Sequence, residues 1–334
     1  MLNARLLLVA GLLFWLSRFA HAQDTSAALP PLSERKIPSS LGASPQPLRY
    51  WGPQVRDGER RPLLVLLHTW SSDYRQDRSD WQREAVERKW FYVQPNFRGP
   101  NQHPDACGSK LARQDVLDAL DWALDEFPVD RSRVYLAGVS GGGHMTMLMA
   151  GYVPERFSAA SAWVGISDLR RWYEFHARSG TPGKYAQMIA KSCGGAPGMS
   201  AEVDDQYRER SPLTVMHRAT ELPLDLNAGV NDGHSGSVPV EHTILAFNAV
   251  AAAQELPVVS REEIDQLWGN RCLTEPQESD TLEDPLYGRE LFLRRIANRA
   301  RVTIFEGGHE ALPHAACEWL SRQQRETAVT PPKK

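Results

Sequence analysis

The sequence has few cysteines, little net charge and only one long apolar run. Its 334 residues include four cysteines, whose spacing fits no zinc-binding pattern. The net charge of −3 lacks the basic excess that nucleic-acid-binding and membrane-surface proteins carry. Beyond the N-terminus no apolar stretch is long enough to span a bilayer, and no repeat appears. The composition therefore indicates a globular protein without a nucleic-acid partner.

The N-terminus carries the one long apolar run. Arg5 precedes the apolar residues 6–16, and the segment ends in the small-x-small pattern Ala20-His21-Ala22. This arrangement predicts a signal peptide over residues 1–22, with an uncleaved anchor as the alternative. We therefore expect a secreted or periplasmic protein with no membrane attachment after cleavage.

An exported protein can form disulfides, and four cysteines allow three pairings. Cys193 and Cys272 both lie in loop-rich segments, which favours that pair. Cys317 lies in a segment of helical periodicity, so we expect it to be a buried free thiol. The sequence predicts no partner or role for Cys107. The oligomeric state is not predicted.

Apolar runs alternate with segments of helical periodicity along most of the chain. The predicted strands are residues 61–70, 90–99, 133–140, 157–168, 222–232 and 300–309. The predicted helices include residues 110–127, 239–255 and 311–323. This alternation predicts an α/β fold, a mostly parallel sheet with helices on both faces. Such folds place their sites at the carboxyl ends of strands.

One serine lies among four glycines between a predicted strand and a predicted helix. Gly138, Ser140 and Gly142 match the pattern G-x-S-x-G. Glycines at these positions let strand and helix approach closely and leave the serine exposed at the end of the strand. The pattern favours Ser140 as a nucleophile over an incidental helix cap.

A serine nucleophile needs a base and an acid that orients the base. His309 follows a strand in "FEGGHE", and Asp232 ends another in "LNAGVNDGHSGS". The order Ser140, Asp232, His309 is typical of the α/β-hydrolase fold. Asp225 and Asp168 remain alternatives for the acid.

Two backbone N–H groups are expected to form an oxyanion hole. The first belongs to Gly141, directly after the nucleophile. The second is assigned to Trp70, although Thr69 stands where this turn usually has glycine. His144, His234 and His242 are given no catalytic role.

The segments "GVSGGG", "AGVNDGHSGSVP" and "FEGGHE" resemble the α/β-hydrolase superfamily, in particular its prolyl-oligopeptidase-like and single-domain esterase branch. The resemblance covers residues 51–323. It implies a serine hydrolase with no metal and no organic cofactor, and it leaves ester and peptide substrates open.

The expected organisation is a linker at residues 23–47 with little structure, a hydrolase domain at 48–323 and a flexible tail at 324–334. Residues 168–213 and 256–291 break the strand–helix alternation, so we expect insertions there that form a lid.

The leading hypothesis is an exported carboxylic ester hydrolase. Export and family analogy suggest a small-molecule or polysaccharide ester, acetyl or feruloyl, as its substrate. The short segment before the domain, without a propeller, favours an esterase over the alternative, a serine peptidase. A non-catalytic binding protein is the second alternative. Six aromatic residues fit either substrate stacking or ordinary packing: Trp70, Trp81, Trp163, Trp172, Tyr173 and Tyr185.

Overall fold

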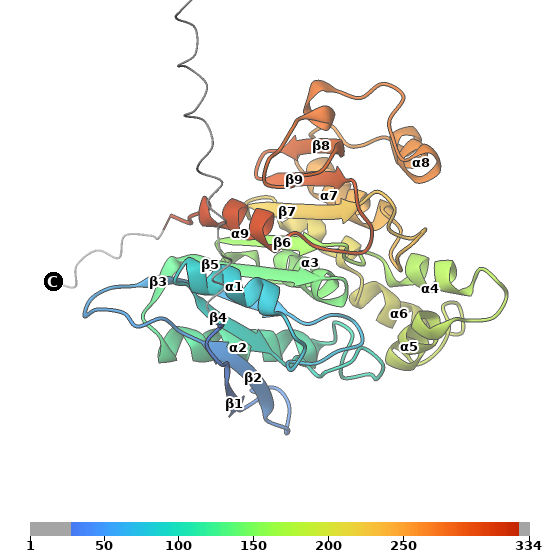
Figure 1. Ribbon diagram of the computed structural model, residues 1–334. Helices are drawn as coiled ribbons and strands as arrows, with labels where there is room; N and C mark the ends of the chain where they lie inside the picture. The colour runs from blue at the N-terminus through green and yellow to red at the C-terminus, as the bar shows by residue number, and fades with distance from the viewer. Residues whose placement is uncertain (1–27, 327–334) are drawn as a thin grey trace, which may run out of the picture.

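The computed structural model describes residues 28–326, which form nine strands of one twisted sheet (Figure 1). In spatial order the strands are β1 (Ser33–Ile37), β2 (Gln46–Trp51), β4 (Phe91–Pro95), β3 (Arg61–Leu67), β5 (Val129–Val139), β6 (Ala159–Trp163), β7 (Leu224–Gly229), β9 (Ala300–Phe305) and β8 (Leu291–Ala297). The six strands from β4 to β9 are parallel. The pairs β1–β2, β2–β4 and β8–β9 are antiparallel. The predicted mostly parallel sheet is therefore confirmed.

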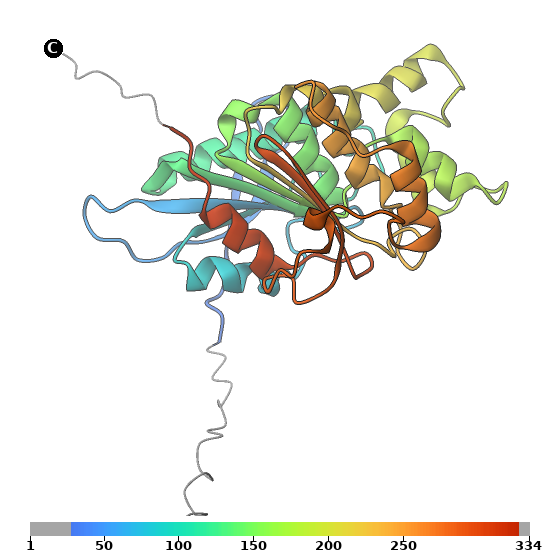
Figure 2. The same cartoon turned by 90° about the horizontal axis from the view of Figure 1, so that it is seen from above.

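Helices cover both faces of the sheet, as the turned view shows (Figure 2). One face carries α1 (Ser79–Glu87) and α9 (Pro313–Ser321), which contact each other. The other face carries α2 (Lys110–Glu126), α3 (Gly141–Tyr152) and α7 (Glu241–Ala252). Because the central strands are buried on both faces, their sequences are nearly continuous apolar runs.

The first insertion contributes three helices at the carboxyl ends of the central strands (Figure 1). They are α4 (Leu169–Ala177), α5 (Lys184–Cys193) and α6 (Ala201–Glu209). The carboxylate of Asp168 caps α4 by accepting from the N–H groups of Arg170 and Arg171. A small apolar cluster, separate from the main core, joins this insertion to Trp70 beneath it. The insertion thus covers the edge of the sheet where the sequence places the site.

Shorter elements complete the described chain. The second insertion holds α8 (Arg261–Asn270) and the 3₁₀ turn η4 (Glu278–Thr281), which packs against β8. Three further 3₁₀ turns are η1 (Pro154–Arg156), η2 (Pro212–Thr214) and η3 (Met216–Arg218). In residues 28–326, no helix has both the length and the apolar character needed to cross a membrane.

The expectation of a linker before the domain is wrong. The supposed linker at 23–47 contains β1 and the start of β2, because β1 pairs with β2 through the main chain. Near the other end, the N–H of Arg325 donates to the carbonyl of Ser132 at 2.9 Å, and residues 327–334 of the predicted tail lie outside the described residues. The predicted signal peptide, residues 1–22, lies outside the described residues.

The predicted Cys193–Cys272 disulfide is also wrong. Cys193 is buried at the end of α5 in the apolar cluster, whereas Cys272 is exposed after α8. All four cysteines are free thiols. Burial raises the pKa of the Cys107 thiol to about 11, which makes it a poor nucleophile. Cys317 is buried as a free thiol, as expected.

Candidate active site

Ser140 stands at a sharp turn between β5 and α3. Its φ of +59° is unusual for a residue with a side chain, and it turns the chain directly into the helix. A Cβ atom on Gly138 would lie 2.3 Å from the backbone of Gly142, so strand and helix meet too closely for larger residues. The turn is fixed by the Ser140 N–H, which donates to the Trp163 carbonyl at 2.8 Å. The G-x-S-x-G segment therefore has the strand–turn–helix form that the sequence predicted.

His309 and Asp232 reach the serine from two neighbouring strand ends. His309 follows β9, and its Nε2 lies 2.8 Å from the Ser140 Oγ. Its Nδ1 lies 2.8 Å from Oδ2 of Asp232, which follows β7. Because a carboxylate only accepts, Nδ1 carries the proton and Nε2 is free to accept from the serine hydroxyl. The three side chains form one continuous hydrogen-bonded chain, with His309 between Asp232 and Ser140.

The Asp232 carboxylate is buried and fully oriented. Its second oxygen, Oδ1, accepts from the N–H groups of Gly233 at 2.9 Å and Val238 at 3.1 Å. These backbone donors compensate for burying the charge and leave Oδ2 for the histidine. The oriented carboxylate in turn orients the His309 ring through Nδ1.

The two predicted oxyanion donors lie against each other. An ideal Cβ on Gly141 would fall 2.3 Å from the Trp70 nitrogen, so the two backbones are in direct contact beside Ser140. The Trp70 side chain is 2% exposed, and its carbonyl accepts from the N–H of Asn101 at 2.9 Å. The Trp70 nitrogen therefore lies beside the Gly141 backbone, and the use of these two N–H groups as an oxyanion hole stays a prediction.

A pocket of about 380 Å³ opens beside Ser140 and His309. Its walls come from the loop after β3, the start of α1, helix α5 and the loop after β9. The lining residues are Thr69, Trp70, Ser71, Arg78, Asp80, Val139, Ser140, Tyr185, His309, Glu310 and Ala311. The hydroxyl of Ser140 therefore faces a space large enough for a small substrate group.

The alternative acids have other roles. Asp225 lies within β7 and pairs with Arg301 on β9 at 2.6 Å. Asp168 caps α4 through its carboxylate. Neither side chain contacts His309, and Asp232 does. Three histidines without a predicted catalytic role form hydrogen bonds to residues other than Ser140, His309 and Asp232: His144, His234 and His242.

Ser237 is a contact that the sequence did not single out. Its Oγ lies 3.4 Å from His309 Nε2, the nitrogen that also meets Ser140. Its carbonyl accepts from Trp172 Nε1 at 2.7 Å and His176 Nε2 at 2.8 Å, both on α4. The insertion therefore braces the loop that carries the acid. No local sequence signal marks this contact, because it depends on how α4 lies over the loop.

Most of the candidate aromatic residues pack inside the protein. The side chains of Trp70, Trp81, Trp163 and Trp172 are buried, and Tyr173 packs beside Tyr207. Tyr185 is half-buried and forms one wall of the pocket. The packing interpretation holds for Trp81, Trp163, Trp172 and Tyr173, whereas the buried Trp70 also lines the pocket. Within residues 28–326, no group of three His, Cys, Asp or Glu side chains is arranged to hold a metal ion.

The chain is similar to proteins named for different activities. Dipeptidyl aminopeptidase BIII of Pseudoxanthomonas mexicana is 25% identical over 202 residues, 56% of this chain and 28% of that protein. Acetylxylan esterase A of Emericella nidulans is 37% identical over 51 residues, 15% of this chain and 17% of that protein. The chain thus spans less than a third of either relative.

Solved structures agree on the fold. The acylaminoacyl peptidase of Pyrococcus horikoshii superposes with a TM-score of 0.59 at 17% identity, over 90% of this chain and 43% of that one.

The family model described as "Prolyl oligopeptidase family" matches residues 79–259, more than half of the chain. The segment that it matches contains Ser140 and Asp232, and the sheet has the α/β-hydrolase arrangement. The chain belongs to the prolyl oligopeptidase family.

Proposed function

We propose that this protein is a serine hydrolase that cleaves carboxylic esters through an acyl-Ser140 intermediate. The observation that carries the proposal is the chain of two 2.8 Å contacts from Asp232 through His309 to Ser140, beside an open pocket. Family membership supports the same class of chemistry.

In this mechanism the Ser140 hydroxyl attacks the carbonyl carbon while His309 Nε2 takes its proton. Asp232 holds the imidazole ring and stabilises the imidazolium that forms. The N–H groups of Gly141 and Trp70 donate to the oxygen that becomes negative, and α3 points its N-terminus at the same region. His309 then protonates the departing alcohol, and water releases the acid from Ser140 by the same steps.

An ester is the preferred substrate class, with acetyl or aromatic esters of carbohydrates as the specific proposal. The partial similarity to an acetylxylan esterase supports the ester, and the predicted export supports an extracellular polymer or its fragments. The half-buried Tyr185 offers the one aromatic side chain of the insertion that lines the pocket. It is placed to contact an acyl or alcohol group.

A peptidase is the second candidate, favoured by the similarity to a dipeptidyl aminopeptidase. The test compares hydrolysis of p-nitrophenyl acetate and alanyl-prolyl-p-nitroanilide by the protein from Gln23 onward, with Ser140→Ala as control. Cleavage of the ester alone, lost in the variant, supports the proposal, and comparable cleavage of the anilide supports the peptidase. If neither substrate turns over above the variant, the binding-protein alternative replaces both.

A further inference from the structure

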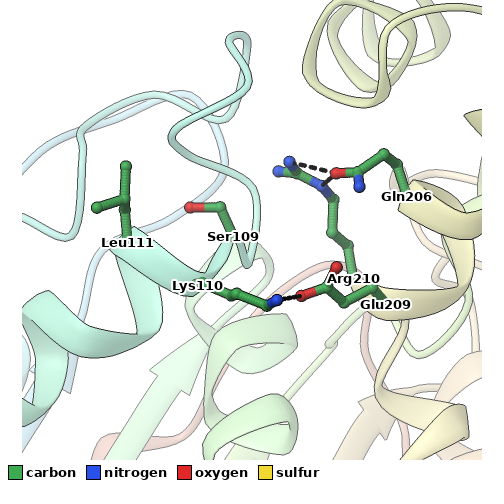
Figure 3. Close-up of a pocket in the computed structure, with 6 residues that line it drawn as sticks. All are labelled: Ser109, Lys110, Leu111, Gln206, Glu209 and Arg210. Carbon is green, nitrogen blue, oxygen red and sulfur yellow. Dashed lines mark hydrogen bonds and ion pairs between the residues drawn. The ribbon is translucent and has the colours of Figure 1, made fainter. Parts of the chain in front are cut away.

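We propose that Arg210, at the end of α6, is a positioning residue that holds the Trp70 oxyanion donor in place. The inference rests on the proposed function, because it concerns the hole that Trp70 forms with Gly141. Arg210 lines a different pocket, between α6 and the start of α2 (Figure 3), and it is not among the residues that line the Ser140 pocket.

The guanidinium of Arg210 is buried and clamps a distant loop. Nη1 donates to the carbonyls of Ala106 at 2.7 Å and Cys107 at 3.3 Å, and Nη2 donates to that of Pro104 at 2.9 Å. Gln206, one turn earlier on α6, accepts from Nε at 3.0 Å and from Nη2 at 2.7 Å, as Figure 3 shows. The forked shape of arginine lets one side chain hold three carbonyls at once, which the single ammonium of lysine does poorly.

The clamped loop leads directly to Trp70. Cys107 has a φ of +53°, a backbone conformation that a non-glycine residue keeps only when its surroundings impose it. Its N–H donates to Asn101 Oδ1 at 2.7 Å, and the N–H of Asn101 donates to the Trp70 carbonyl at 2.9 Å. Arg210 and Trp70 are therefore joined by three hydrogen bonds that run through Cys107 and the buried Asn101.

A second path from Arg210 reaches the nucleophile helix. The carbonyl of Arg210 accepts from His144 Nε2 at 2.7 Å. His144 lies one turn after Ser140, and its N–H donates to the Ser140 carbonyl at 2.8 Å. Its ring packs edge-on against the Trp70 indole, with centroids 5.7 Å apart. Arg210 is thus linked to both sides of the proposed hole, to Trp70 through residues 101–107 and to the helix that begins after Ser140 through His144.

A positioning role predicts a specific kinetic signature. A misplaced oxyanion donor weakens binding of the transition state and leaves binding of the ground-state ester unchanged. For Arg210→Met we expect kcat to fall by about tenfold to a hundredfold, the range that small misplacements of reacting groups produce. KM should stay the same, and the inhibition constant of a trifluoromethyl ketone, which forms a tetrahedral oxyanion, should rise in parallel with the loss of kcat.

The experiment measures kcat and KM for p-nitrophenyl acetate per active site, counted by titration with a fluorophosphonate. Arg208→Met is the matched control, because Arg208 lies on the same helix with its side chain 65% exposed and pairs with Asp205. Gln206→Ala is the milder second variant. It keeps the guanidinium but removes its orienting acceptor, so a severalfold loss of kcat is expected even if Arg210→Met fails to fold.

The outcomes separate the inference from the function beneath it. Equal kcat per titrated site and equal inhibition by the ketone in the wild type, Arg210→Met and Gln206→Ala would show that Arg210 is merely structural. A fall only in the titrated fraction has the same meaning. A wild-type protein that neither hydrolyses the ester nor reacts with the fluorophosphonate overturns the proposed function, and this inference with it.

Discussion

Three buried neutral histidines should make the protein unstable in mild acid. His68, His144 and His242 are completely buried, and burial lowers their pKa values from 6.5 to about 4, 4 and 3. In the unfolded chain the same histidines take up protons near pH 6.5. Between pH 6.5 and pH 4 the unfolded state therefore binds more protons than the folded state. The free energy of unfolding must fall as the pH falls through this window.

The size of the effect follows from linkage. Each pKa unit of difference is worth about 1.4 kcal/mol. At pH 5, 1.5 pH units below the unfolded value, each histidine removes about 2 kcal/mol, or about 6 kcal/mol for all three. Typical domains have about 5–15 kcal/mol of stability in total, so acid unfolding should begin near pH 5. Burial also lowers the pKa values of His176 and His234, which acts in the same direction.

Urea unfolding followed by tryptophan fluorescence at pH 7.5 and pH 5 measures this loss directly. His242→Gln is the informative variant, because a glutamine oxygen can accept from the Ser167 N–H as the Nδ1 of His242 does. The variant should lose about 2 kcal/mol less between the two pH values than the wild type. Equal free energies of unfolding at pH 7.5 and pH 5 would refute the reasoning.

Three further changes test the site by steady-state kinetics. Gly141→Ala places a Cβ 2.3 Å from the Trp70 nitrogen, so it should displace that donor and cost about 100- to 1000-fold in kcat; normal activity would contradict the assigned hole. Asp232→Asn should lower kcat by roughly ten-thousandfold, while Asp168→Asn, which keeps the cap of α4, should leave kcat unchanged; the reverse result would exchange their roles. Tyr185→Ala should raise KM for aromatic esters by about tenfold more than for acetyl esters, and an equal change for both would show that its ring does not contact the acyl group.

The sequence predicted the central strands and the proximity of Ser140, His309 and Asp232, for a physical reason. Strands buried on both faces must be apolar, so each apolar run between residues 61 and 309 can be recognised from its own residues. The glycines around Ser140 are imposed by the close contact of β5 and α3, and they too leave a local pattern. Local constraints of this kind can be read without knowing the rest of the fold.

The missed elements depend on partners far away in the chain. β1 has the sequence SERKI, and four of its five residues are exposed, so main-chain pairing with β2 holds it without any apolar pattern. β8 contains Arg294 and Arg295, whose burial depends on the carboxylates of Asp284 and Asp280. A charged pair in a strand argues against burial until its partners are known.

The contacts by which the first insertion supports the site could not be predicted from the sequence either. Trp172 and His176 both donate to the carbonyl of Ser237, and Arg210 donates to the loop beneath Trp70. These are side chain to backbone contacts between segments about 60 to 100 residues apart. No spacing in the sequence reports them, so a helical cover was predicted but its role as a brace was not.

The most direct test of the account is to find the acyl group on the enzyme. The protein is mixed with p-nitrophenyl acetate, quenched in acid within the first turnover and digested for peptide mass spectrometry. The account predicts a burst of p-nitrophenol and one acetyl group on the peptide that contains Ser140, both absent in Ser140→Ala. Turnover of the ester with the acetyl group on another residue, or with a burst that survives in Ser140→Ala, would contradict it.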